Sequence, residues 1–310
     1  MIIGRRIRLK WLLQIEGRNI LFFLIYGGLV HVLNLLFLLE TRVFSMTEIG
    51  FFGTAVVILL GFRNNEAYRR YWEARTAWGE LTNASRYFAS EVMGYIQPPR
   101  GKEHANAAAQ DAAGIHTELI YRHLAFLNAL RLQLRKEETW EELKPFLLDS
   151  EFQVLAKAAN KATILNHRQA LRLRELYTSG WIKQPTYIFG LMETVKEIFA
   201  AQGRCERIKN TPLPRQYAFF TKSFVWIFVL LLPFALIQHL GWTALPIYIV
   251  LATIFTVTER IGSRTEDPFE LKMEDVAMSS ICRNIEIDLR QQLGEASVPS
   301  PLAPADGVLM

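Results

Sequence analysis

The chain has 310 residues, of which 51% are hydrophobic, and a formal net charge of +5. Its mean hydropathy of +0.13 is high for a soluble protein and low for a transporter that lies wholly in the membrane, so we expect membrane spans joined to a sizeable polar region. The two cysteines form no CxxC pair, which excludes a disulfide framework and a cysteine zinc site. Because the chain contains long apolar runs, binding to a membrane explains its basic charge better than binding to nucleic acid.

The first apolar run covers residues 19–39, "NILFFLIYGGLVHVLNLLFLL", which meets the length of about 20 residues that a bilayer demands. A basic segment, residues 1–18, precedes it. The run is too long for a signal-peptide core and no A-x-A site follows, so we expect an uncleaved first span.

The second apolar run, residues 49–62, is short. At about 1.5 Å per residue it covers about 21 Å, less than a hydrocarbon core of about 30 Å. Its polar continuation must therefore be sheltered by protein or face water. Thr54, Ile58 and Phe62 recur on one helix face, which either packs against another helix or lines a pore with an apolar constriction. Arg63 follows at the inner end of this span.

Residues 63–216 form the large polar region. Leucines and isoleucines between 115 and 134 recur near a period of 3.6, and no run alternates as a strand does, so this region is predicted to be helical. A proline-marked turn at 210–217 leads into two more spans within 217–258. A further helix is expected within 259–294, and the Pro/Ala/Ser-rich tail, 295–310, is expected to have no fixed structure of its own.

Four spans put both termini on one side of the membrane. Arginine and lysine are abundant before the first span and between the second and third, whereas the links 40–48 and 238–241 hold a single arginine. The positive-inside rule therefore predicts cytoplasmic termini and a cytoplasmic 63–216 region.

No pattern in the sequence indicates catalysis. The six histidines form no HExxH, and we find no P-loop, no GxGxxG and no G-x-S-x-G. We therefore expect no enzyme, no cofactor and no metal site. The acidic stretch 264–275 lacks the spacing of an EF-hand loop. Within it, Asp267-Pro268-Phe269 is interpreted as a turn that ends the fourth span, and a solvated helix is expected to follow from Met273.

Three stretches carry a family resemblance: "LGFRNNEAYRRYWEARTAWGELTNASR" (60–86), "GRCERIKNTPLPRQYAFFTKSFVWIFVLLLPFAL" (203–236) and "EDPFELKMEDVAMSSICRNIEIDL" (266–289). They resemble the bacterial branch of the bestrophin family, and with the four spans the resemblance covers nearly the whole chain.

The resemblance implies an all-α fold with four transmembrane helices per subunit and a large helical cytosolic region, assembled as a homopentamer around one central pore. It implies an ion channel of the bacterial inner membrane, whose partners are its own copies, monovalent ions and lipids, with no nucleic acid. Span two would line the pore, with a hydrophobic neck at Thr54, Ile58 and Phe62. A second constriction near the cytosolic exit would fall at Thr186, and the vestibule candidates are Arg63, Arg69 and Arg70.

The chain departs from the family pattern at three places. Thr54 and Thr186 are polar where apolar residues are usual, so both constrictions are expected to be weaker barriers. Animal members bind Ca²⁺ in an acidic clasp, of which Asp267 and Asp275 remain here while Lys272 stands where a carboxylate is wanted. An ammonium group inside a Ca²⁺ shell is unfavourable, so we predict no calcium activation.

The family contains chloride channels and monovalent cation channels. The outer link holds Glu40, Arg42 and Glu48, a net −1 per subunit that becomes −5 over five copies. An acidic mouth favours cations, and Ile58 lacks the positive ring edge that helps an anion, so the sequence favours monovalent cations such as Na⁺. Two alternatives stay open: a membrane-tethered scaffold or signalling protein without conductance, and a secondary transporter, although spans one and two show no Gly/Pro break to match those of spans three and four.

Overall fold

The computed structural model describes residues 9–37, 45–99, 105–305 and 307–309. Within these residues the chain is helical and holds no β-strand, which confirms the predicted all-α class. The chain divides into two compact units. One, which we call the membrane unit, holds the described residues up to Tyr71 together with Pro212–Pro268. The other, the polar unit, holds Trp72–Thr211 and the described residues from Phe269 onward.

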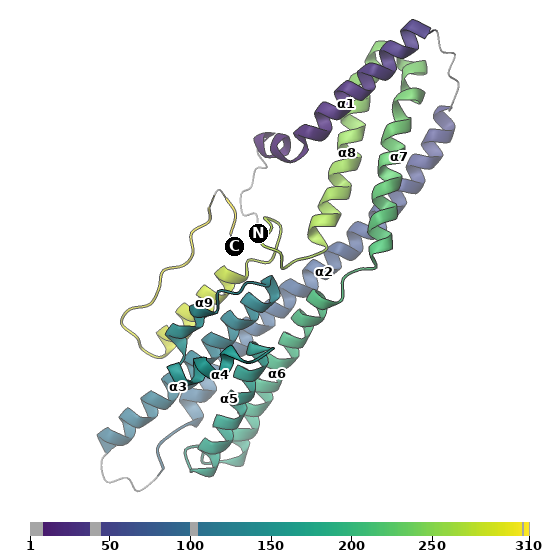
Figure 1. Cartoon of the computed structure of the whole chain (residues 1–310). Helices are drawn as coiled ribbons and strands as arrows, with labels where there is room; N and C mark the ends of the chain where they lie inside the picture. Colours follow the sequence, from purple (N-terminus) through teal and green to yellow (C-terminus); the bar gives the residue numbers. More distant parts are fainter. Residues whose placement is uncertain (1–8, 38–44, 100–104, 306, 310) are drawn as a thin grey trace. The chain divides into compact units, whose positions relative to one another are not determined.

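The membrane unit contains α1 (Leu9–Phe37), the first part of α2 (Met46–Tyr95), α7 (Arg215–Leu240) and α8 (Ala244–Thr265). Three described stretches are long and apolar enough to cross a membrane, namely Glu16–Leu36, the N-terminal part of Met46–Tyr95, and Arg215–Thr265, which includes both α7 and α8. Figure 1 shows α1, α7 and α8 running alongside one another. Their facing sides form one apolar core, whose largest fully buried members are Phe23 and Tyr248.

Two local signals explain where these helices begin and end. Ser45 and Glu48 form a reciprocal capping box at the start of α2: the Glu48 N–H donates to the Ser45 hydroxyl (3.3 Å) and the Ser45 N–H donates to the Glu48 carboxylate (2.8 Å). Between α7 and α8 the chain turns at Gly241, whose φ of 54° is accessible to glycine at little cost, and continues through the short 3₁₀ helix η2 (Gly241–Thr243).

Helix α2 is 50 residues long and is buried on one side only. One series of its buried positions follows spacings of four and three residues, which is a repeat of 3.5. In the membrane unit they are Ile49, Gly53, Val56, Leu60, Arg63 and Ala67. The same rhythm returns in the polar unit with Ala74, Ala77, Leu81, Ala84, Phe88 and Glu91. One stripe of α2 therefore meets neighbouring helices throughout, and the opposite stripe faces outward from the chain.

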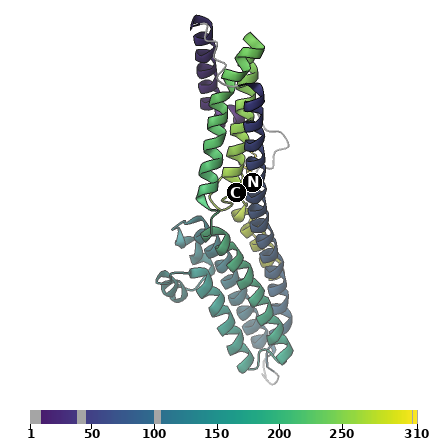
Figure 2. The same ribbon diagram turned by 90° about the vertical axis from the view of Figure 1, so that its right-hand side faces the viewer.

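The polar unit is a bundle in which the C-terminal part of α2 is joined by α3 (Ala105–Arg135), α5 (Lys161–Thr178) and α6 (Pro185–Asn210). Both views show α3, α5 and α6 lying side by side (Figures 1 and 2). The short helices η1 (Trp140–Phe146) and α4 (Asp149–Ala156), and the later helix α9 (Met278–Gln292), complete the unit. Helix α3 supplies much of the core through Leu119, Ile120, Leu124, Phe126, Leu127 and Leu130, as its predicted 3.6 periodicity requires.

Three boundaries differ from the predicted ones. Helix α1 begins at Leu9, inside the segment expected to precede the first span. Helix α8 continues to Thr265, and the next helix starts only at Met278 because a turn occupies 266–277. The tail is not structureless throughout, since Glu295 accepts a hydrogen bond from the Tyr121 hydroxyl (2.8 Å) and pairs with Arg290 (2.7 Å).

Candidate functional site

The candidate site is the outward stripe of α2 in the membrane unit. Ile58 is 53% exposed and Phe62 is 70% exposed, and Thr54 is exposed one turn before them. The structure therefore places the three predicted neck residues on one unpacked face. It adds Phe51, which is 74% exposed and lies seven residues before Ile58, so both side chains project from the same face. Sequence reasoning missed Phe51, although extending the series by one heptad would have found it.

The Thr54 hydroxyl is partly satisfied by a hydrogen bond within its own helix. Its hydroxyl donates to the Gly50 carbonyl at 2.9 Å, so the proton is not offered to water or to an ion. What the side chain presents outward is mainly its methyl group and an acceptor oxygen. The expectation that Thr54 makes this end of the face wetter is weakened accordingly.

A groove of about 390 Å³ runs along one edge of this face, between α2 and α7. Thr54, Val57 and Ile58 line it on the α2 side, and Phe228, Leu232 and Leu236 line it on the α7 side. The two helices approach closely at Gly53, where a Cβ atom would lie 2.8 Å from Cε2 of Phe228. The absence of a side chain at Gly53 therefore sets the position of α2 against α7.

Arg63 does not lie on the exposed face. Its guanidinium group donates to Glu259 of α8 at 2.9 Å and to Glu266 at 3.3 Å, and the side chain is buried. The prediction of Arg63 as a vestibule residue is corrected in this respect, because two carboxylates already surround its charge. One residue further, the Asn64 side chain donates to the Thr258 carbonyl at 3.1 Å, so α2 and α8 are joined by a polar cluster.

The other two vestibule candidates differ from each other. Arg69 is exposed and pairs with Glu66 one turn earlier (3.2 Å), an arrangement in which solvent screens both charges. Arg70 is half-buried. Only Arg69 remains on the outward stripe of α2, and its charge is offset by its neighbour.

Of the two acidic residues predicted at the outer mouth, the structure describes only Glu48. Glu48 belongs to the capping box of α2, where its carboxylate is exposed and negatively charged groups are favoured by the helix dipole. Glu40, like Arg42, lies outside the described residues.

Thr186 lies in the polar unit, in the first turn of α6 directly after Pro185. It is exposed, and its hydroxyl donates to the Gln184 side chain at 3.4 Å. The neighbouring Tyr187 ring stacks on Tyr95 of α2, with ring centroids 4.4 Å apart and the planes 3° from parallel, so the start of α6 is held firmly against α2.

The two residual clasp residues do not share a compact unit. Asp267 is half-buried in the membrane unit, and Asp275 is buried in the polar unit. The Asp275 carboxylate accepts the backbone N–H of Glu270 and that of Lys272 (3.0 Å), and burial raises its pKa although these bonds oppose the effect. Asp275 therefore holds the turn through backbone donors, and the described residues contain no cluster of three or more potential metal ligands.

The family model described as "Bacterial/Fungal Bestrophin protein" matches residues 8–291. A protein of Mesorhizobium japonicum named "Voltage-dependent anion channel-forming protein mll4386" is 34% identical over 285 residues, which covers 92% of this chain and 86% of the relative. The "Voltage-dependent anion channel-forming protein YneE" of Escherichia coli K12 is 32% identical over 265 residues, 84% of this chain and 81% of the relative.

Solved structures agree on the fold. A crystal structure of a bacterial bestrophin homologue from Klebsiella pneumoniae superposes with a TM-score of 0.80 at 22% identity and covers 90% of this chain and 98% of its own. Because the family model spans most of the chain and relatives above 30% identity span its length, the chain is an integral membrane protein that belongs to the bacterial and fungal bestrophin family.

Proposed function

We propose that the chain forms a passive channel for small monovalent ions, in which α2 of each copy lines a central pore and five copies assemble around it. Membership of the bestrophin family and the names of the relatives support a channel rather than an enzyme. The same proposal places the protein in the bacterial inner membrane, with both termini and the polar unit in the cytoplasm.

The observation that carries this proposal is the exposed apolar face of α2. Phe51, Ile58 and Phe62 project from a helix whose opposite stripe is buried along its length. In a ring of copies such a face would form stacked apolar rings, and narrow apolar rings restrict ions because water leaves them readily. Thr186 would contribute a second, weaker constriction on the cytosolic side.

A flux assay with purified protein in liposomes tests the channel. We expect ion flux from the wild-type chain, and altered conductance or selectivity after Ile58→Ala or Phe62→Ala, because each change widens an apolar ring. Leu59→Ala is the matched control, since Leu59 is 38% exposed and points about 100° around the helix from Ile58. Absence of flux from folded protein would favour a membrane-tethered scaffold without conductance. Equal effects of all three substitutions would mean that this face of α2 does not form the neck.

For the sign of the ion we propose a small preference for cations such as Na⁺. It rests on the acidic outer link and on the absence of an aromatic ring at Ile58. The names of the relatives refer to anions, and the described part of the neck carries no charge, so the preference must be set outside the neck.

We also propose that calcium does not activate the channel. Asp275 already accepts two backbone donors, and Lys272 would place an ammonium group in the shell of a bound ion. Single-channel recording in chelator and then in calcium is the test, and a strong increase in open probability with calcium would contradict it.

A further inference from the structure

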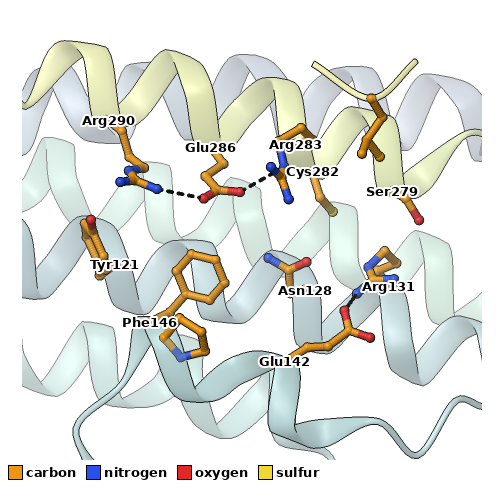
Figure 3. A pocket seen from close by; sticks show the side chains of 12 residues that line it. Tyr121, Asn128, Arg131, Glu142, Phe146, Ser279, Cys282, Arg283, Glu286 and Arg290 are labelled. Carbon is orange, nitrogen blue, oxygen red and sulfur yellow. Dashed lines mark hydrogen bonds and ion pairs between the residues drawn. The ribbon is translucent and has the colours of Figure 1, made fainter. Parts of the chain in front are cut away.

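The polar unit contains a cavity of about 620 Å³ that the channel function does not use. Helix α3, the 3₁₀ helix η1, helix α9 and Leu302 of the tail form its walls (Figure 3). This volume lies within the range of about 300–1,000 Å³ in which proteins bind small molecules.

Two helices present their cavity-lining residues at regular spacings. On α9, Ser279, Arg283, Glu286 and Arg290 follow one another at intervals of four, three and four residues, so they share a face. On α3, Arg131 lies one turn after Asn128 and approaches the cavity from the facing side. Side chains that are far apart in the sequence thus converge on one space.

The cavity offers more hydrogen-bond donors than the protein itself uses. Arg283 pairs with Glu286 through Nε (3.3 Å), and among the described residues its two terminal nitrogens have no partner. Arg131 is buried and pairs with Glu142 and Glu137, yet its Nε has no acceptor within the described part of the chain. Three arginines and two glutamates line the space, and Glu137 and Glu295 pair with two of these arginines. Among the described residues, Arg283 is the lining arginine whose terminal nitrogens are left for a ligand. A guanidinium group suits phosphate and carboxylate oxygens, which it can bind with two parallel hydrogen bonds.

The rest of the wall is apolar or aromatic. Phe146 and Tyr121 lie with ring centroids 6.1 Å apart, and Leu302 and Pro145 extend this surface. Cys282 also faces the cavity, but burial raises the pKa of its thiol to about 12, so it contributes packing and no nucleophile.

We propose that this cavity binds a soluble organic phosphate whose body is aromatic or apolar. Arg283 and Arg131 bind the phosphate oxygens, and Phe146, Tyr121 and Leu302 contact the body. The cavity lies wholly within the polar unit, so the proposal does not depend on the channel function.

Titration calorimetry and thermal unfolding of the full chain in detergent test the site, with phenyl phosphate as the probe. We expect binding that raises the unfolding midpoint, and at least tenfold weaker binding after Arg283→Gln because a charge-assisted hydrogen bond is lost. Arg86→Gln is the matched control: Arg86 pairs with Asp288 (2.6 Å), which lies on the opposite face of α9. Arg283→Lys keeps the positive charge but lacks the planar guanidinium group, so it should bind phenyl phosphate less tightly than the wild type and more tightly than Arg283→Gln. If Arg283→Gln fails to fold, weaker binding by Arg283→Lys than by the wild type supports the site, and equal binding contradicts it.

Two further probes separate the sources of the phosphate. Inorganic phosphate lacks the body, and dihexanoyl phosphatidic acid carries a lipid phosphate, so both should bind more weakly than phenyl phosphate. Three outcomes would overturn the proposal: no binding of phenyl phosphate at millimolar concentration, equal affinity in wild type and Arg283→Gln, or tighter binding of either further probe.

Discussion

The guanidinium group of Arg63 lies between the carboxylates of Glu259 and Glu266, and all three side chains are largely withdrawn from solvent. Removing one member of such a cluster leaves the others without compensation, which typically costs about 3–5 kcal/mol. Arg63→Gln should therefore lower the thermal unfolding midpoint in detergent markedly. Arg69→Gln removes an exposed pair with Glu66 and should cost at most about 1 kcal/mol. Equal midpoints for the two variants would mean that the Arg63 cluster contributes no more to stability than the exposed pair of Arg69 and Glu66.

The sequence predicted the position of Arg63 at the inner end of span two, but it could not predict the partners. Glu259 and Glu266 are 196 and 203 residues away from Arg63 along the chain, and many other acidic side chains lie in the intervening sequence. Only the packing of α8 against α2 selects these two carboxylates. The shared face of Thr54, Ile58 and Phe62 was easier to predict, because helix geometry alone determines it.

His123 gives the polar unit a stability that depends on pH. Its ring is fully buried, its Nε2 lies 2.8 Å from the Ser85 hydroxyl, and burial lowers its pKa from 6.5 to about 3. Between these values the unfolded chain binds a proton at this site and the folded chain does not. The free energy of unfolding should therefore fall as the pH is lowered from about 6.5 toward 3.

The variant His123→Phe isolates this contribution. Its unfolding midpoint should change less between pH 7 and pH 5 than that of the wild type, whereas the exposed His167→Gln should retain the wild-type dependence. The same pH dependence in His123→Phe and wild type would assign the effect to other groups.

Two adjacent glycines of α1 differ sharply in their surroundings. A Cβ atom at Gly27 would lie 2.7 Å from Cδ1 of Tyr248, whose ring is buried, whereas nothing lies within 4 Å of a Cβ at Gly28. Gly27→Ala should destabilise the membrane unit by about 1–3 kcal/mol through overpacking. Gly28→Ala should be neutral or stabilising by up to about 1 kcal/mol, because alanine favours the helix. Unfolding midpoints in detergent measure both effects. An unchanged midpoint for Gly27→Ala would show that Tyr248 and α8 can shift to accommodate the added methyl group without loss of stability.

Helices and turns were predicted correctly where the sequence carries a clear local pattern. The apolar spans, the 3.6 periodicity of α3 and the proline-marked turn before α7 are all legible in the sequence. The start of α9 was placed too early because 266–277 contains neither glycine nor a strong helix stop beyond Pro268, and the turn there is built around the buried Asp275 carboxylate. A tertiary hydrogen-bond arrangement of this kind leaves no periodic pattern to find.

Two substitutions separate the acidic charge of Glu48 from its capping role. Glu48→Gln keeps a side chain that can complete the capping box but removes one charge per copy, whereas Ser45→Ala removes the cap and keeps the charge. If the outer charge favours cations, Glu48→Gln should shift the reversal potential in asymmetric NaCl toward the chloride potential, most clearly at low salt. Ser45→Ala should leave it unchanged. If the reversal potential shifts in both variants, or in neither, the charge of Glu48 does not contribute to ion selectivity.

Assembly was not predictable from periodicity or composition, because a single chain does not encode the number of its copies in any local pattern. The proposed number of five copies comes from the family resemblance alone, and the structure adds that the apolar stripe of α2 is unpacked within one chain. Its extent, from Phe51 to Phe62, is longer than the resemblance indicated.

The 3.5-residue rhythm of α2 also limits how the length of this helix can change. Inserting one residue between Ile58 and Phe62 would rotate all that follows by about 100°, which carries Phe62 off the exposed stripe and Arg63 away from its carboxylates. Inserting seven residues would restore both registers two turns later. Natural relatives whose helix corresponding to α2 is longer or shorter should therefore differ from this chain in steps of whole heptads, so that the helix changes length without changing which side is exposed.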